Sequence, residues 1–416
     1  MIVGSGWHFT SGISYYTCRL ANAVAENAAT SVLLMRRLVP RWLYPGRRRV
    51  GRKVNDLEYN ERVHVLDGVD WYWGPSVVHA ARFLRRERPD VMVLQWWTGA
   101  VLHTYLLLSV LAKARGTRVI MEWHEVQDTG EARLLGVRKY VTWGMRRLLA
   151  HVDGHVLHSE FDLGQVRAAY NLAGPVRITP HGPYDHFRLM PSEPSDLSGD
   201  DETVIGPAES PPTPPDAATV RTVLYFGVIR PYKGVEDLIS AFDLLPDELA
   251  CNVRLLIVGE TWEGWTAPQR AVEASPRRDR IEVINEYVSD DAVGRLFGQA
   301  DAVALPYRRS SASGPLHIAM SVGLPVLVSD VGGLQSAARD YEGTVFTRPQ
   351  DPHDIARGLE VLLSMCGRRF ADPHSWERTV AAHLSIMDQV GVRGTHGRHE
   401  VDVGDVTGSA SVGAAS

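Results

Sequence analysis

The chain has 416 residues, 44% of them hydrophobic and 22% charged, and a formal net charge of −5. This length exceeds what one hydrophobic core supports, and the composition excludes a wholly disordered chain, a collagen-like sequence and a polytopic membrane protein. The three cysteines, Cys18, Cys251 and Cys366, lie far apart, which excludes a disulfide framework or a cysteine-based zinc site and is typical of a reducing compartment.

Up to about residue 185, short apolar segments alternate with helical patterns. The strand-like segments are rich in β-branched residues or Leu, and the residues between them are apolar at helical spacing over 13–24 and 77–84. This alternation predicts crossover units and a parallel sheet that is buried on both faces. The predicted strands span residues 31–35, 63–66, 91–94, 118–121 and 155–157.

The beginning of the chain shows no charged segment and no cleavage site after Met1, so we expect no signal peptide and a cytoplasmic protein. The first part of the chain is nevertheless basic: up to residue 190 there are 25 Lys and Arg against 16 Asp and Glu, and beyond it 19 against 33. Residues 36–53 contain eight basic residues and no acidic one. This asymmetry fits an anionic partner, such as a membrane surface, a lipid phosphate or nucleic acid, and a solvated basic face equally well.

Residues 191–219 interrupt the alternation. They contain seven prolines, seven acidic residues and no Lys, Arg or aromatic residue, which predicts a disordered linker or a surface insertion. A second alternating series follows, then a helix over 376–387 and a tail, 391–416, that we expect to be disordered. Together these features predict two doubly wound α/β domains, which bind ligands at the carboxyl ends of their strands. The second series has predicted strands at 223–226, 254–258, 281–284, 302–305 and 325–328 and helices at 235–244, 290–297 and 316–322.

A loop in the second series has the residues that a pyrophosphate site needs. A predicted strand ends at Gly227, a short loop carries Arg230 and Lys233, and a helix begins near Gly234. Two cations at a strand end, beside a helix N-terminus, suit a pyrophosphate, because Arg offers a bidentate fork and Lys a compact point charge. Such a loop alone is more often an ordinary pair of surface cations.

Two further segments are typical of anion binding. Ser313 is a natural N-cap and Pro315 fits a first helical turn, so the free N–H groups of Gly314 and its neighbours would point at an anion. An ordinary capped helix explains this segment as well. Gly12, in the turn after the first strand, would let the backbone approach a phosphate closely, whereas the residues around Gly6 fit a nicotinamide-type fingerprint poorly.

These segments, in this order, resemble the family-4, or group 1, glycosyltransferases of the GT-B fold from about residue 12 to residue 387. Each motif alone is weak, but six in the right order are specific. The matching motifs are Ser11-Gly12-Ile13, Thr179-Pro180-His181-Gly182, Pro231-Tyr232-Lys233-Gly234, Gly323-Leu324-Pro325-Val326, Asp330-Val331-Gly332-Gly333 and Ser375-Trp376-Glu377.

The resemblance implies two Rossmann-like domains that face a cleft. The first, residues 1–185, would bind the acceptor, and the second, residues 220–373, would bind the nucleotide sugar. A helix over 374–390 would cross back to the first domain. Such an enzyme transfers a sugar from a nucleotide-diphospho-sugar with retention of the anomeric configuration and, by this resemblance, without a divalent metal or other cofactor.

The resemblance also assigns roles to residues. Arg230 and Lys233 would stabilise the departing diphosphate, and His124 would contact the transferred sugar. The partners would be a nucleotide sugar and a glycan, lipid-linked or small-molecule acceptor, without nucleic acid, and residues 36–53 favour a peripheral position at an anionic membrane. We expect the donor to be bound by Gly12, Gly227, Glu260, Tyr287, Ser311, Ser313, Gly314, Pro315 and Leu316.

The chain departs from the family pattern at three positions. Val228 stands where the family has an arginine, and Arg230 can substitute for it. Ser310 and Ile318 stand where the family has a pair of glutamates, the second of which hydrogen-bonds the nucleotide ribose. A catalytically inactive sugar-nucleotide-binding protein is therefore an alternative, and a nucleotide-sugar epimerase on the same fold is a weaker one.

Overall fold

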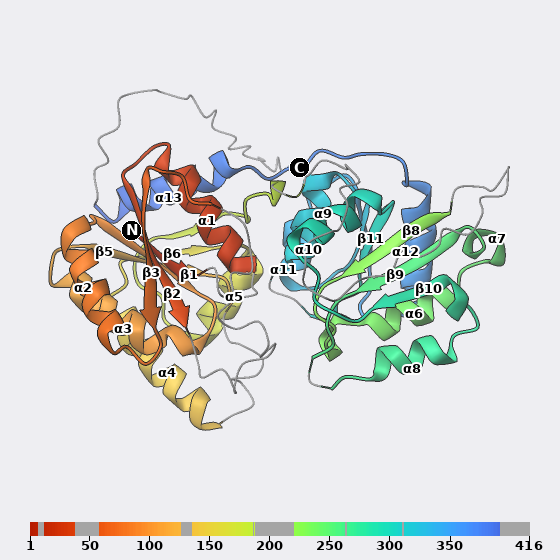
Figure 1. Cartoon of the computed structure of the whole chain (residues 1–416), viewed down its shortest axis with the longest axis horizontal. Helices are drawn as coiled ribbons and strands as arrows, with labels where there is room; N and C mark the ends of the chain where they lie inside the picture. Colours follow the sequence, from red (N-terminus) through yellow and green to blue (C-terminus); the bar gives the residue numbers. More distant parts are fainter. Residues whose placement is uncertain are drawn as a thin grey trace, which may run out of the picture.

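Figure 1 shows two α/β lobes side by side, with the C-terminal helix lying on the lobe that contains the N-terminus. Most of the basic segment 36–53, the predicted linker 191–219 and nearly all of the predicted tail lie outside the part of the chain that the structure describes, as do Ser310 and Ser311. The structure, a computed structural model, describes residues 1–6, 12–37, 58–125, 135–185, 187, 220–262, 264–309 and 312–391.

The first sheet has the strand order β3-β2-β1-β4-β5-β6-β7, and all its strand pairs are parallel. Helices cover both faces, so a strand such as β4 is buried along its whole length, which explains its unbroken apolar sequence. The short β7 was not predicted, because its three half-buried residues carry no apolar pattern. The strands are β1 (Ile2–Ser5), β2 (Thr30–Arg37), β3 (Val63–Asp70), β4 (Val91–Trp96), β5 (Arg118–Trp123), β6 (Gly154–Leu157) and β7 (Val176–Ile178).

The helices of the first lobe include two that the sequence predicted, α1 and α2, and others that it did not. The helix α3 escaped prediction because apolar residues occur around its whole circumference, so that its sequence lacks a 3.6-residue period. The described helices of this lobe are α1 (Gly12–Ala25), α2 (Pro75–Glu87), α3 (Leu102–Lys113), α4 (Leu135–Leu149) and α5 (Glu160–Ala169).

The second sheet is also parallel and has the order β10-β9-β8-β11-β12-β13, so that β8 takes the place that β1 has in the first sheet. The strand order reverses between β8 and β11. The strands are β8 (Arg221–Phe226), β9 (Val253–Val258), β10 (Ile281–Ile284), β11 (Ala302–Leu305), β12 (Val326–Ser329) and β13 (Thr344–Thr347). The helices around them are α6 (Val235–Asp243), α7 (Asp247–Ala250), α8 (Ala267–Ala274), α9 (Asp290–Gln299), α10 (Gly314–Val322), α11 (Gly332–Ala338) and α12 (Pro352–Ser364).

The last helix, α13 (Trp376–Gln389), crosses back and packs on α1 and on the first sheet (Figure 1). Trp376, Val380 and Ile386 belong to the same hydrophobic core as residues of β1, α1 and β6. Gly182 lies beneath Trp376, whose indole N–H donates to the carbonyl oxygen of Pro183 at 3.1 Å. The predicted GT-B fold, with its crossover helix, is confirmed. Among the described residues, no helix is both long enough and apolar enough to cross a bilayer.

Candidate active site

The loop after β8 carries the two cations that the sequence indicated. β8 and β11 are the strands between which the order of the second sheet reverses, and ligands bind at such a switch point in doubly wound sheets. The chain leaves β8 through Gly227, which has a φ of 126°, and forms the 3-10 turn Pro231–Lys233. Gly234 has a φ of 64°, and a Cβ there would lie 2.2 Å from the carbonyl oxygen of Pro306. Only glycine permits this close packing of the turn.

Arg308, which the sequence analysis did not identify, holds this turn in place. Its backbone N–H donates to the carbonyl oxygen of Tyr232 at 2.8 Å, and its Nη1 donates to that of Pro231 at 3.1 Å. The same guanidinium donates two hydrogen bonds of 2.8 Å to Asp237 and pairs with Glu236 at 2.9 Å. Because a bidentate carboxylate fixes the guanidinium, the turn rests on a rigid support.

The amine of Lys233 points inward, although the residue as a whole is half-buried. Its Nζ lies 3.6 Å from the centre of the ring of Tyr307, which is completely buried. Burial lowers the pKa of Lys233 to about 7; Arg230 adds to this lowering, whereas Glu125 of the first lobe opposes it. The sequence predicted a compact point charge here. In the structure, burial makes this amine hold its proton less tightly than an exposed lysine does.

Arg230 lies beside one of the predicted donor ligands. Its Cζ is 4.7 Å from the centre of the ring of Trp262, and the indole N–H of Trp262 donates to Oε2 of Glu260 at 2.9 Å. The backbone of Glu260 also accepts a 3.0 Å hydrogen bond from the N–H of Ile229, in the same loop as Arg230. Glu260 therefore lies next to the cation loop.

The start of α10 adjoins the same loop. The Ser313 hydroxyl caps the helix by accepting from the N–H of Leu316 at 3.4 Å. A Cβ at Gly227 would lie 3.5 Å from Cγ of Pro315, so the helix start and the cation loop are neighbours. The Leu316 N–H, which the sequence predicted to be free, is engaged by this cap, and Pro315 has no N–H. Gly314 is therefore the residue that offers a first-turn N–H to an anion. Ser311 lies outside the described residues.

Two other predicted donor ligands, Gly12 and Tyr287, lie where the lobes meet. The carbonyl oxygen of Gly12, the first residue of α1, accepts from the Tyr184 hydroxyl at 3.1 Å. A Cβ at residue 12 would lie 2.9 Å from that hydroxyl, so Gly12 lies close to Tyr184 rather than to open space. Burial raises the pKa of Tyr15, and Asp290 and Tyr287 of the second lobe raise it further. Tyr287 is therefore near α1.

In the first lobe, His124 directly follows β5, and Glu122 two residues earlier is completely buried. Oε1 of Glu122 accepts from the Tyr16 hydroxyl at 2.6 Å and lies 3.1 Å from Nε2 of His383 on α13, and Oε2 accepts from Gln95 at 3.0 Å. Burial alone would raise the pKa of Glu122, but His383 and His124 hold it well below its usual range. The Glu122 charge in turn raises the pKa of His383. A charged Glu122 thus ties β5 to the crossover helix.

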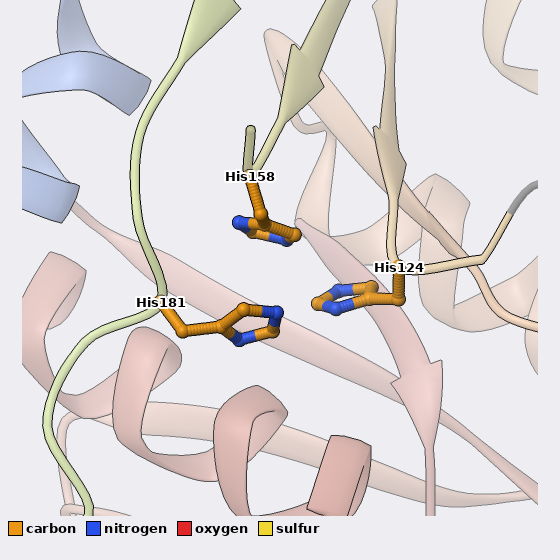
Figure 2. A group of neighbouring side chains, drawn as sticks. All are labelled: His124, His158 and His181. Carbon is orange, nitrogen blue, oxygen red and sulfur yellow. The ribbon is translucent and has the colours of Figure 1, made fainter. Parts of the chain in front are cut away.

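Two further histidines lie beside His124, and the sequence analysis did not assign them to the site. His158 directly follows β6, His181 follows β7, and the three rings point toward one another (Figure 2). Burial lowers the pKa of His158 to about 3 and the pKa of His181 well below its usual value, so both rings are neutral. The sequence could have predicted this group from the positions of the three histidines just after β5, β6 and β7, because neighbouring parallel strands end at one edge of the sheet.

Ring contacts connect this histidine group to the second lobe. The rings of His158 and His181 are 3.8 Å apart, and those of His181 and His317, in α10, are 5.4 Å apart. The backbone N–H of Tyr184 donates to Oγ of Ser321, also in α10, at 2.9 Å. The helix whose N-terminus adjoins the cation loop therefore also contacts the histidine side of the junction.

Comparison with known proteins agrees with this architecture. Residues 211–371 match the family model for glycosyl transferases group 1, and residues 11–182 match that for the glycosyl transferase 4-like domain. The two models together span both lobes.

Individual relatives have low sequence identity to this chain and match only part of it. A D-inositol 3-phosphate glycosyltransferase from Salinispora tropica is 28% identical over 263 residues, which cover 59% of this chain and 53% of that protein. A GDP-mannose:glycolipid 4-beta-D-mannosyltransferase from Xanthomonas campestris is 37% identical over 108 residues, covering 25% of this chain and 29% of that one. The chain thus matches about half the length of the first relative and less than a third of the second.

Solved structures share the fold over nearly the whole length. Sucrose-phosphate synthase from Thermosynechococcus elongatus has a TM-score of 0.58 at 16% identity and covers 94% of both chains. HepE from Anabaena, solved in complex with UDP-glucose, has a TM-score of 0.56 at 13% identity and covers 94% of this chain and 95% of its own. With both lobes matched by family models, this chain belongs to the group 1 glycosyltransferases of the GT-B fold.

Proposed function

We propose that this protein transfers a sugar from a nucleotide-diphospho-sugar to an acceptor with retention of the anomeric configuration. The observation that carries the proposal is the pair Arg230 and Lys233 at the switch point of the second sheet, beside the first turn of α10. The family supports it, as does HepE, which has the same fold and was solved with UDP-glucose. In this proposal the second lobe binds the donor and the first binds the acceptor.

Catalysis would consist mainly of stabilising the departing nucleoside diphosphate. Arg230 offers a forked donor to the phosphates, and Gly314 offers a backbone N–H. A diphosphate near Lys233 would raise the pKa of its amine from about 7, so that the bound substrate itself restores the positive charge. In a site from which water is excluded, such a charge stabilises the transition state more than it would in water.

The first lobe would supply the remaining contacts. His124 would contact the transferred sugar at the end of β5. Glu125, the next residue, acts electrostatically on Lys233 across the junction. This proximity supports a reaction centre that lies between the sugar side of the first lobe and the phosphate side of the second.

We propose that the transfer needs no divalent metal on the donor phosphates. Arg230 and Lys233 would neutralise the phosphates instead, and the sequence lacks an Asp-x-Asp motif. Among the described residues, the side chains that could jointly hold a metal are three imidazoles, whereas Mg²⁺ prefers oxygen ligands.

We also propose a glycan or lipid-linked acceptor and a peripheral position at the cytoplasmic face of a membrane. The basis is the basic segment 36–53. Arg36 already pairs with Asp70 at 2.6 Å, and Arg37 lies 4.0 Å from the same carboxylate, so the basic residues beyond these two would provide the attraction. The protein should co-sediment with anionic liposomes at low salt and not with zwitterionic ones. Equal recovery in both pellets would contradict a role for these charges.

A second candidate function, sugar-nucleotide binding without turnover, is favoured by one residue. Ile318 stands where the resemblance places the ribose-binding glutamate, and its apolar side chain is buried in α10. It cannot hydrogen-bond a ribose. An active enzyme would have to hold the ribose through other groups.

A thermal-shift screen with UDP, GDP and ADP, followed by turnover assays with the matching nucleotide sugars, tests both candidates. We expect one nucleotide to raise the melting temperature, because a ligand that binds only the folded state stabilises it. Release of nucleoside diphosphate, with a product of unchanged anomeric configuration by NMR, would support the transferase. A shift without turnover would support the binding protein. No shift with any nucleotide would contradict both.

A further inference from the structure

His124, His158 and His181 form a group to which the proposed function gives one role, the contact of His124 with the transferred sugar. One ring nitrogen from each of the three residues lies within 4.8 Å of those from the other two, and all three residues are buried. They come from the ends of three adjacent strands, so the rigid edge of the sheet places them together (Figure 2). We propose that these three histidines bind one zinc ion.

The ring nitrogens lack hydrogen bonds that a metal would have to break. Both nitrogens of His124, both nitrogens of His181 and Nε2 of His158 are buried and have no hydrogen-bond partner among the described residues. A buried polar atom without a partner costs free energy, so a missing ligand is a better explanation than chance. Imidazole nitrogen is the ligand that zinc, copper and nickel share.

The tautomer of His158 is already the one that a metal needs. Its Nδ1 lies 3.0 Å from the carbonyl oxygen of Thr179, and since a carbonyl only accepts, Nδ1 must carry the proton. Nε2 of the neutral ring therefore presents its lone pair to the group. Metal-bound histidines typically have this second hydrogen bond, which fixes the orientation of the ring.

Glu122 supplies the negative charge that a buried dication requires. Its carboxylate oxygens lie 3.8 Å from Nε2 of His124 and 3.9 Å from Nε2 of His158, too far for hydrogen bonds. An ion held by these two nitrogens would lie close to the carboxylate, and a buried cation is stable only when an anion compensates it.

One ring must move for the ion to fit. Three nitrogens around a tetrahedral zinc lie about 3.3 Å apart, given Zn–N bonds of about 2.0–2.1 Å. The His181 ring now stacks on that of His158 at 3.8 Å and 31°, so it has to turn its edge toward the other two rings. Neither of its nitrogens has a hydrogen bond that resists this rotation.

A bound ion would compete with the sugar for His124, and this one consequence rests on the proposed function. Zinc should therefore inhibit the transfer as it fills the site. The metal site itself is independent of the transfer, and the experiment below reads metal binding directly.

The test is a Co²⁺ titration of the full chain after treatment with a chelator and its removal. Tetrahedral Co²⁺ absorbs visible light far more strongly than the aqueous ion, and zinc should displace it. We expect one ion per chain, with the affinity lowered at least 100-fold in His158→Gln and in His181→Asn, because even changes to residues behind the ligands lower metal affinity about 10–100-fold.

Two exposed histidines provide matched controls. His79→Gln, on α2, should leave the titration unchanged, and so should His64→Gln, which removes an exposed imidazole 2.9 Å from Glu87. Absence of the tetrahedral spectrum, its persistence in both group variants, or its loss in His64→Gln would overturn the proposal. Inhibition by zinc without that spectrum would also contradict it.

A second measurement does not depend on the folding of any variant. NMR of the histidine ring nitrogens in the wild-type protein should show three imidazoles whose ligating nitrogens shift when zinc is added. Shifts confined to the exposed histidines would overturn the proposal.

Discussion

The two sheets of the molecule have the same strand order around their central strands, β1 and β8, but their carboxyl ends carry different chemistry. In the second lobe, Arg230 and Lys233 follow the central strand β8 on a turn that Arg308 fixes. In the first lobe, the buried imidazoles of His124, His158 and His181 gather after strands β5 to β7, near the carboxylate of Glu122. The two lobes thus share the same arrangement of strand ends, and the residues placed at those ends determine whether they attract an anion.

The largest effect should come from removing the charge on the second lobe. Lys233→Ala should lower kcat/KM by about 100- to 1000-fold, because a charge that stabilises the leaving group is lost. Steady-state assays with the donor identified by thermal shift would measure it. Lys139→Ala, on the exposed side of α4, is the matched control and should behave as wild type. Similar rates for the two variants would contradict the assignment.

In the first lobe, removing the buried charge of Glu122 should lower the stability of the protein. Glu122→Gln leaves His383 facing a neutral amide in the core, and we expect the free energy of unfolding to fall by about 3 kcal/mol. Urea denaturation at pH 7 would measure this change. Glu282→Gln removes the partner of Arg254 from an exposed pair with an N–O distance of 3.2 Å and should cost less than about 1 kcal/mol. Equal losses would show that the buried carboxylate has no special role.

A change behind the cation turn should have a smaller effect on rate. Arg308→Lys replaces a forked donor with a point charge, so the turn loses part of its support and kcat/KM should fall about tenfold. The melting temperature should change little, and Arg254→Lys should leave the kinetics unchanged. If Arg308→Lys lowers the melting temperature but not kcat/KM, the residue is structural only.

The pH dependence should be the smallest effect. Burial lowers the pKa of Lys233 to about 7, although the negative charge of Glu125 acts to raise it. The fraction of the lysine that is charged, and so attracts a diphosphate, therefore decreases as the pH rises through 7. kcat/KM, which reports the free enzyme, should therefore fall about fivefold between pH 7 and pH 8. In Lys233→Arg this fall should disappear, because arginine stays charged. A fall that persists in this variant would assign it to another group.

Much of the architecture could be predicted from the sequence, because a buried parallel strand such as β11 appears as a short apolar run that the structure places at the same residues. The helix α3 could not be, since its apolar residues occur on all sides. The cation loop and the cap at Ser313 follow local rules and were identified. The grouping of His158 and His181 depends on which strands are neighbours in the sheet, and the lowered pKa of Lys233 depends on burial that only the folded chain provides.

The most direct test is isothermal titration calorimetry of the preferred nucleoside diphosphate with the wild-type protein, Arg230→Ala and Lys139→Ala. If Arg230 and Lys233 bind the phosphates, Arg230→Ala should weaken binding at least tenfold, and the affinity of the wild type should decrease between pH 6 and pH 8. Lys139→Ala should bind as wild type does. An unchanged dissociation constant in Arg230→Ala, with no dependence on pH, would contradict the account.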